Sequence, residues 1–190
     1  MQYNVYFDTE FTGLYKDTTL ISLGLVTQDN KRLYLEFNDF NEHQCDEWIK
    51  QNVLDNLYSQ NDVNEFINNK LNRYNYGNRR ENVMVLKDWL DKLYEDEIQL
   101  VSDCCHYDMM LFIDLFGNAF DLPKYINPIC HDINQDIAYY FNLTEKQAFD
   151  LSREEILREY KDEINNMKKH NSLYDAEVIK RIYDIVRVIY

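Results

Sequence analysis

The chain has 190 residues, of which 45% are apolar, and a formal net charge of −14 from 20 basic and 34 acidic side chains. This length and apolar content suit one domain of ordinary size, so we expect residues 1–190 to form a single domain. The acidic balance argues against a protein that coats long duplexes, because Lys and Arg normally supply the phosphate contacts of such binding. It does not exclude an enzyme that holds a few nucleotides with the help of bound metal ions.

No apolar run is long enough to cross a bilayer, and the first ten residues lack the basic and apolar stretches of a signal peptide. We therefore expect no membrane contact and a cytoplasmic location. The four cysteines are Cys45, Cys104, Cys105 and Cys130. They show no CxxC spacing, which is typical of reduced thiols in a cytosol. A zinc cluster that adds His106 and His131 to the last three cysteines is the alternative, and we rank it below plain thiols.

Residues 5–14 read Val-Tyr-Phe-Asp-Thr-Glu-Phe-Thr-Gly-Leu and predict a strand that carries two carboxylates into a turn. Side chains alternate along a strand, so Asp8 and Glu10 leave the same face, roughly 6.6 Å apart, while Val5 and Phe7 point the other way. No neighbouring cation offsets their repulsion. Mg²⁺ or Mn²⁺, which prefer oxygen ligands, would do so. The alternative is a solvated strand end.

The next segments predict a meander followed by helices. Residues 19–27 and 32–37 have strand character, and Asp29-Asn30 between them is a turn signal. Apolar residues at helical spacing predict a helix over 44–57 and a shorter one over 63–71. Residues 72–82 read as a loop whose tyrosines and arginines (Tyr74, Tyr76, Arg79, Arg80) could contact a nucleic acid strand. A plain polar connection is the favoured interpretation.

A helix over 81–95 and a buried strand over 98–102 precede a third acidic candidate. Gly117 is a helix stop signal, which places Asp108 near the first turn of the helix before it, close to its positive end. Asp103, directly after the strand, is a competing acidic candidate, but at that position it is equally a turn or cap residue. A fifth strand is expected over 129–133, with Asp132 capping a helix over 135–141. A helix over 152–160 and a charged, solvated segment over 161–169 follow.

The last informative stretch is His170-Asn-Ser-Leu-Tyr-Asp175-Ala176, which opens a helix that runs toward Tyr190. Ser172 and Asp175 match a capping pattern, so we expect the helix to begin at Ser172. His170 then lies on the preceding loop, beside a carboxylate fixed on the helix. A histidine in that position suits a general base, and a surface histidine is the alternative.

Together these stretches resemble a known family. Asp8-x-Glu10-x-Thr-Gly-Leu, Tyr107-Asp108 after a strand, and His170-x4-Asp175-Ala resemble, in order and chemistry, the motifs of the DEDDh (RNase T-like) 3′-to-5′ exonucleases. The likeness spans nearly the whole chain and is nearest to the compact, stand-alone bacterial and phage exoribonucleases. It implies an α/β fold of the RNase H-like type, with a mixed five-stranded sheet and flanking helices.

The resemblance also implies a mechanism. Two Mg²⁺ or Mn²⁺ ions would be held by Asp8, Glu10, Asp108 and Asp175, would help to activate the attacking water and would stabilise the departing 3′ oxygen. His170 would take the proton from that water. Nucleoside 5′-monophosphates would leave one at a time from a 3′-hydroxyl end. Residues expected to touch the terminal nucleotide are Thr9, Phe11 and Leu14, although Leu14 is equally a candidate for the core.

The motifs leave the substrate open, because recognition of a 2′-hydroxyl depends on details of the pocket. We favour single-stranded RNA or short oligoribonucleotides, with single-stranded DNA as the nearest competitor. A catalytically silent nucleic-acid-binding module and a purely structural protein are the other classes. The 16 tyrosines would permit a homodimer, but tyrosines are equally common in ordinary cores.

Overall fold

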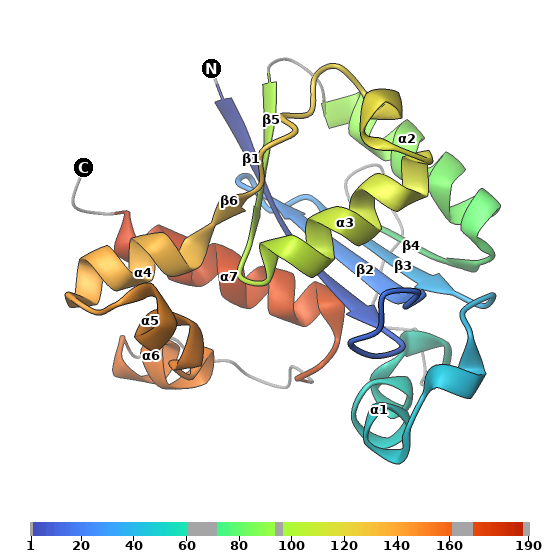
Figure 1. Cartoon of the computed structure of the whole chain (residues 1–190). Coiled ribbons are helices and arrows are strands. Elements are labelled where there is room, and N and C mark those ends of the chain that lie inside the picture. Colours follow the sequence, from blue (N-terminus) through green and yellow to red (C-terminus); the bar gives the residue numbers. More distant parts are fainter. Residues whose placement is uncertain (1, 61–71, 94–96, 161–168, 188–190) are drawn as a thin grey trace.

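The structure is a computed structural model that describes residues 2–60, 72–93, 97–160 and 169–187. A six-stranded mixed sheet forms the centre, in the order β4-β3-β2-β1-β5-β6, and helices cover both of its faces (Figure 1). The strands are β1 (Gln2–Phe11), β2 (Leu20–Thr27), β3 (Arg32–Phe37), β4 (Asn72–Gly77), β5 (Glu97–Ser102) and β6 (His131–Asp132). β1, β2 and β3 form the predicted antiparallel meander, whereas β4, β5 and β6 pair in parallel with their neighbours.

Seven α-helices and several 3₁₀ turns connect the strands within the described residues. The α-helices are α1 (Glu47–Asn52), α2 (Arg79–Leu93), α3 (Cys105–Phe116), α4 (Ile133–Phe141), α5 (Glu145–Asp150), α6 (Arg153–Glu159) and α7 (Ser172–Val186). Two of the 3₁₀ turns, η1 (Glu42–Gln44) and η2 (Leu54–Asn56), flank α1. α1 packs Ile49 and Val53 against Ile21 of β2, which attaches this segment to the sheet.

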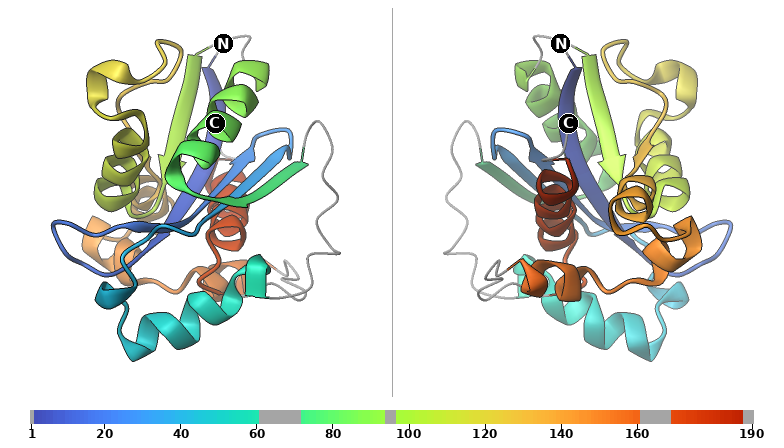
Figure 2. Two further views of the ribbon diagram at one scale, coloured as in Figure 1. Left: turned by 90° about the vertical axis from the view of Figure 1, so that its right-hand side faces the viewer. Right: turned by 90° about the vertical axis from the view of Figure 1, so that its left-hand side faces the viewer.

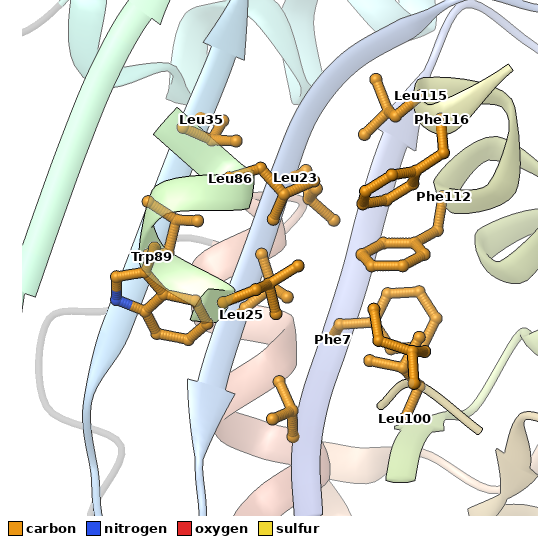
Figure 3. Close-up of a cluster of buried hydrophobic side chains, with 14 of the residues drawn as sticks. Phe7, Leu23, Leu25, Leu35, Leu86, Trp89, Leu100, Phe112, Leu115 and Phe116 are labelled. Carbon is orange, nitrogen blue, oxygen red and sulfur yellow. The ribbon is translucent and has the colours of Figure 1, made fainter. Parts of the chain in front are cut away.

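One face of the sheet packs against α2 and α3. Val5 and Phe7 of β1 point to this side, as the alternation of the strand predicts, and Phe7 meets Phe112 of α3 edge to face. Leu86 and Trp89 of α2 cover Leu23, Leu25 and Leu35 of the meander (Figure 3). Burial of these large side chains is the main stabilisation of this layer.

The opposite face packs against α4 and α7. In the left view of Figure 2, α2 lies above the blue strands and α7 (red) lies below them. Tyr6, the residue between Val5 and Phe7, joins a core with Ile179 and Ile182 of α7. Because side chains alternate, Asp8 and Glu10 continue the row begun by Tyr6 and face α7 rather than α3.

Gly24 of β2 permits an unusually close approach of α7. A Cβ atom at this position would overlap the backbone of Ser172 and Leu173, the first two residues of the helix. Gly24 pairs with Asp8 across the β1–β2 ladder, and Ser22 on the same strand forms a hydrogen bond of 2.8 Å with the Ser172 hydroxyl. The first turn of α7 is therefore held directly beneath the acidic end of β1.

The prediction of five strands was wrong by one. β4 was expected to be part of a loop over 72–82, because its sequence, Asn-Arg-Tyr-Asn-Tyr-Gly, has no apolar alternation. It forms an edge strand whose backbone pairs with β3, and an edge strand needs little apolar surface. Of the four side chains considered there as nucleic acid contacts, two are engaged internally, since Tyr74 donates to Glu36 and Arg79 pairs with Asp114. The other two, Tyr76 and Arg80, are exposed. The strand expected over 129–133 shortens to His131–Asp132.

The helix predictions also need corrections. The expected helix over 44–57 is broken, because Asp46 is extended and caps α1 through the Ile49 amide, and η2 follows after Val53. The helix α5 was not predicted. α7 begins at Ser172 as expected, but its cap is Asn171 and not Ser172. Asp132 caps α4, and Gly117 ends α3, as predicted.

Two sequence expectations fall wholly or mostly outside the described residues, the helix over 63–71 and the charged segment over 161–169. Within the described ranges, no helix combines the length and apolarity that a membrane crossing requires.

We predict that Gly24→Ala destabilises the protein by at least about 2 kcal/mol, because the new methyl group must displace the backbone of α7. Urea unfolding checks this. Gly77→Ala is the matched control, since the atoms nearest to its Cβ belong to the side chains of Glu81 and Asn75, which can move. Equal stability of the two variants would contradict the close approach described above.

Candidate active site

The acidic end of β1 supplies the first two groups of the site. Asp8 and Glu10 are partly buried and face α7, while Thr9 between them is buried on the other side of the strand. The Thr9 hydroxyl donates a hydrogen bond of 2.6 Å to Asp108. The strand therefore positions two carboxylates directly and a third through the residue between them.

Asp108 is buried in the first turn of α3, as the sequence predicts. Its second carboxylate oxygen accepts a hydrogen bond from Ser102, the last residue of β5. With both oxygens engaged by hydroxyl groups, the side chain is fixed in one orientation. Its carboxylate oxygen lies within 4.8 Å of those of Asp8 and Asp103.

His170 and Asp175 reach the same place from the start of α7. One ligand atom from each of Glu10, His170 and Asp175 lies within 4.8 Å of the other two. His170 has a left-handed backbone with φ of 60°, a conformation that non-glycine residues adopt at a cost of about 1–3 kcal/mol and that clusters at functional sites. The structure thus brings together all five residues that sequence reasoning proposed as catalytic.

Asp103 is the acidic residue whose place the sequence did not reveal. The sequence left it open as an acidic candidate or a turn or cap residue, and the structure groups its carboxylate with those of Asp8 and Asp108. It also pairs with Arg153, at 3.0 Å from the guanidinium Nε. The arginine in turn donates to the carbonyls of Ala148 and Leu151 and thereby ties the α5–α6 segment to this corner of the site. The position of Asp103 directly after β5 was the only sequence signal for its place in the site.

These residues line one pocket with a volume of about 420 Å³. The α5–α6 segment forms its other wall, with Phe149 and Leu151 on the apolar side. Two cations, Arg153 and Lys169, also line the pocket, but they pair with Asp103 and Glu154. In the part of the chain that the structure describes, no Lys or Arg side chain pairs with Asp8, Glu10 or Asp175.

The consequence is a cluster of carboxyl groups that resist ionisation. Burial, followed by the charges of Asp108 and Asp175, holds the pKa of Asp8 well above its usual range. Burial also raises the pKa of Glu10 well above its usual range, with Asp175 as the next cause. It raises the pKa of Asp108 to about 7, although Ser102 and Thr9 act in the opposite direction, and the pKa of Asp175 to about 8.

His170 is shifted in the opposite sense. Burial, reinforced by the nearby charge of Lys169, lowers the pKa of its imidazole from the usual value. A histidine with a lowered pKa is largely neutral at pH 7 and has a ring nitrogen free to accept a proton.

The donor set fits divalent cations that prefer oxygen. Two groups of three candidate ligands share the pocket, Glu10 with His170 and Asp175, and Asp8 with Asp103 and Asp108. Carboxylates without cationic partners gain a large favourable interaction with Mg²⁺ or Mn²⁺, since the ions offset both burial and mutual repulsion.

A second pocket, of about 490 Å³, adjoins the first and shares Glu10 and Phe11 with it. Phe11 stacks on Tyr107 with ring centroids 5.1 Å apart, which fixes its ring between the two pockets. Leu14, weighed earlier as a core residue, is 76% exposed and lines the second pocket together with Trp48. Of the three residues predicted to contact a nucleotide, Thr9 and Phe11 line the first pocket, and Phe11 and Leu14 line the second.

The zinc cluster considered for the cysteines has no counterpart in the groups of candidate ligands among the described residues. All four cysteines carry free thiols, and the sulfur atoms of Cys105 and Cys130 lie 3.0 Å apart.

The chain was compared with known proteins. Neither a family model nor a curated protein matches it. Solved structures do match across 98% of the chain. The nuclease domain of 3′hExo, a DEDDh family member bound to rAMP, has a TM-score of 0.64 at 15% identity over 91% of that chain. A 3′-exonuclease that recognises the 3′ end of a histone mRNA stem-loop has a TM-score of 0.62 at 16% identity over 81% of that chain. Pop2p of S. pombe, in a form with bound Mg²⁺ and Mn²⁺, has a TM-score of 0.62 at 15% identity over 83% of that chain. The fold is RNase H-like. The predicted fold class is thereby confirmed, apart from the number of strands.

The raised carboxyl pKa values predict how stability depends on pH. The pKa values of Asp108 and Asp175 are higher in the folded state than in the unfolded chain. Their contribution to the free energy of unfolding is therefore complete at low pH and is lost as pH rises through 7 to 8. The lowered pKa of His170 makes the folded state more stable as pH rises, but this is the effect of one group against two. We expect the melting temperature in chelator to fall by about 5 °C or more between pH 5.5 and 8.

Mn²⁺ bound to the ionised carboxylates should remove this fall. At one hundred times its dissociation constant, one bound ion stabilises the folded state by about 2.7 kcal/mol. The melting temperature is measured over the same pH range, once with Mn²⁺ and once with chelator. Identical curves in both conditions would count against the site, and Asp175→Asn should flatten the curve measured in chelator.

Proposed function

We propose that this chain is a metal-dependent 3′-to-5′ exoribonuclease of the DEDDh type, with residues 1–190 as one exonuclease domain. The observation that carries the proposal is the convergence of Asp8, Glu10, Asp108, Asp175 and His170, from three separate segments, on one pocket. The likeness to 3′-exonuclease folds over 98% of the chain supports it. A binding module or a structural protein would have no need for a neutral histidine beside uncompensated carboxylates.

In the proposed reaction, Asp8, Glu10, Asp108 and Asp175 would hold two Mg²⁺ or Mn²⁺ ions, whose charge would help to activate water and to stabilise the leaving 3′ oxygen. The structure of Pop2p with Mg²⁺ and Mn²⁺ bound supports this choice of ions. His170 accepts the proton of the attacking water at a ring nitrogen. Thr9 and Ser102 hold the Asp108 carboxylate in place through their hydroxyl groups. The product of each cycle is a nucleoside 5′-monophosphate.

The 3′-terminal nucleotide is proposed to lie across the two adjoining pockets. Phe11 separates them, so its ring can contact the sugar or base while the scissile phosphate faces the acids. Leu14 is exposed beside it and offers apolar contact, and Thr9 contributes through its backbone. Because the chain carries a net charge of −14, a grip on one or two terminal nucleotides suits it better than contact with a long duplex.

RNA is preferred over DNA in this proposal. The 3′-exonuclease that recognises an mRNA stem-loop and the 3′hExo domain bound to rAMP support an RNA substrate, single-stranded or short. A cytoplasmic location goes with four free thiols. The bacterial and phage subtype and the homodimer remain predictions from the sequence.

The test is hydrolysis of 5′-end-labelled RNA and DNA oligonucleotides of one sequence, with Mn²⁺ or chelator. We expect a ladder that shortens from the 3′ end in Mn²⁺, faster with RNA. Asp8→Ala should abolish the ladder, because it removes a proposed ion ligand whose carboxylate interacts with the charges of Asp108, Asp175 and Glu10. His170→Ala should slow the reaction by about 10²–10⁴-fold, the usual contribution of a general base.

Asp184→Ala is the matched control, since Asp184 lies on α7 like Asp175 but pairs with Lys180 outside the pocket. It should cleave at the wild-type rate. A faster ladder with DNA would reassign the substrate. Retarded but intact strands would indicate a binding module, and full activity of Asp8→Ala would overturn the assignment of the site.

A further inference from the structure

The loop that carries His170 is held on both sides by one residue of η2. The Asn56 side-chain amide donates a hydrogen bond of 2.8 Å to the carbonyl of Lys169. The Asn56 backbone carbonyl accepts one of 3.2 Å from the side chain of Asn171. Lys169 and Asn171 are the two chain neighbours of His170. Asn56 therefore spans the histidine from a segment more than 110 positions earlier in the sequence.

The same segment also contacts the imidazole. Trp48 of α1 packs edge to face on the His170 ring, with centroids 4.9 Å apart. Asn56 itself is anchored to α1, because its amide also donates to the Asn52 carbonyl at 2.6 Å. The unit of α1 and η2 thus fixes both the backbone of the histidine and the plane of its ring.

Asn171, the chain neighbour of His170 on the other side, connects this loop to the sheet. Asn171 is buried, caps α7 and donates a hydrogen bond of 3.0 Å to the hydroxyl of Tyr34 on β3. His170 is thereby held between a fixed helix cap and the α1–η2 unit. Its left-handed backbone persists only where the surroundings impose it, and a loop free to relax would leave that conformation.

We infer that Asn56 is a positioning residue for His170, an assignment that rests on the proposed function. It lies outside both sets of pocket-lining residues and acts through the loop. A base displaced by a fraction of an ångström to 1 Å loses efficiency without any change in the metal ligands or the nucleotide pocket. Removing the Asn56 amide should therefore lower turnover and leave substrate binding intact.

The kinetic test measures hydrolysis of a short RNA by Asn56→Ala and by Asn56→Asp, which keeps the volume but cannot donate to Lys169. We expect kcat to fall about 10- to 100-fold in both, with KM within about twofold of wild type. In a His170→Ala background the same change should lower kcat less than twofold, because the group that Asn56 positions is gone. An equal fall in both backgrounds, or an unchanged kcat in either variant, would refute the inference.

Asn52→Ala is the matched control. Asn52 lies one turn away on α1, and its side chain donates only within the helix, to the Trp48 carbonyl, so its kcat should match wild type. A readout without substrate separates this inference from the proposed function. The imidazole NMR signal of His170 should move or broaden in Asn56→Ala and stay in place in Asn52→Ala. If wild type cleaves nothing, the proposed function fails, and the NMR comparison alone decides whether Asn56 positions the histidine.

Discussion

The site depends on one close contact, the seating of the first turn of α7 against β2 over Gly24. No side chain separates the helix backbone from the strand there, and the Ser22–Ser172 hydrogen bond fixes the approach. Because Gly24 pairs with Asp8 across the ladder, the same contact sets the distance between the acids of β1 and those of α7. The separation of Glu10, His170 and Asp175 follows from this packing and not from any bond between their side chains. A helix seated further from β2 would separate Glu10 of β1 from His170 and Asp175.

The clustered carboxyl groups of the site also lower the stability of the folded state. Six carboxyl groups line the pocket, and among the described residues only those of Asp103 and Glu154 pair with cations, Arg153 and Lys169. Burial and mutual repulsion disfavour the charged form of the others, an unfavourable interaction that ion binding relieves. Several contacts stabilise the site against this repulsion. Hydroxyl groups of Thr9 and Ser102 hold Asp108, and apolar layers of α2, α3, α4 and α7 hold the sheet. Function therefore concentrates unfavourable charge at a place that these contacts hold together.

Local signals in the sequence were sufficient for much of this arrangement. The alternation of β1, the stop at Gly117 and the cap at Asp132 are each decided by neighbours in the chain, and all three were predicted correctly. The errors involve distant partners. β4 is a strand only because β3 offers it an edge, and Asp103 gains its place from an arginine fifty positions later. Asn171 caps α7, although Ser172 had the same local chemistry, because Ser172 is buried against Ser22. Such choices are made by tertiary packing, which no local pattern contains.

The central claim is that these separated acids form one site for paired divalent ions, and counting bound ions tests it most directly. The chelator-treated protein is titrated with Mn²⁺, and electron paramagnetic resonance measures the signal of the free ion. The loss of that signal gives the number of bound ions per chain. We expect two ions per chain in the wild-type protein and a clear loss of binding in Asp108→Asn, whose fold is supported by the same layers. Saturation at zero ions, or undiminished binding by the variant, would contradict it.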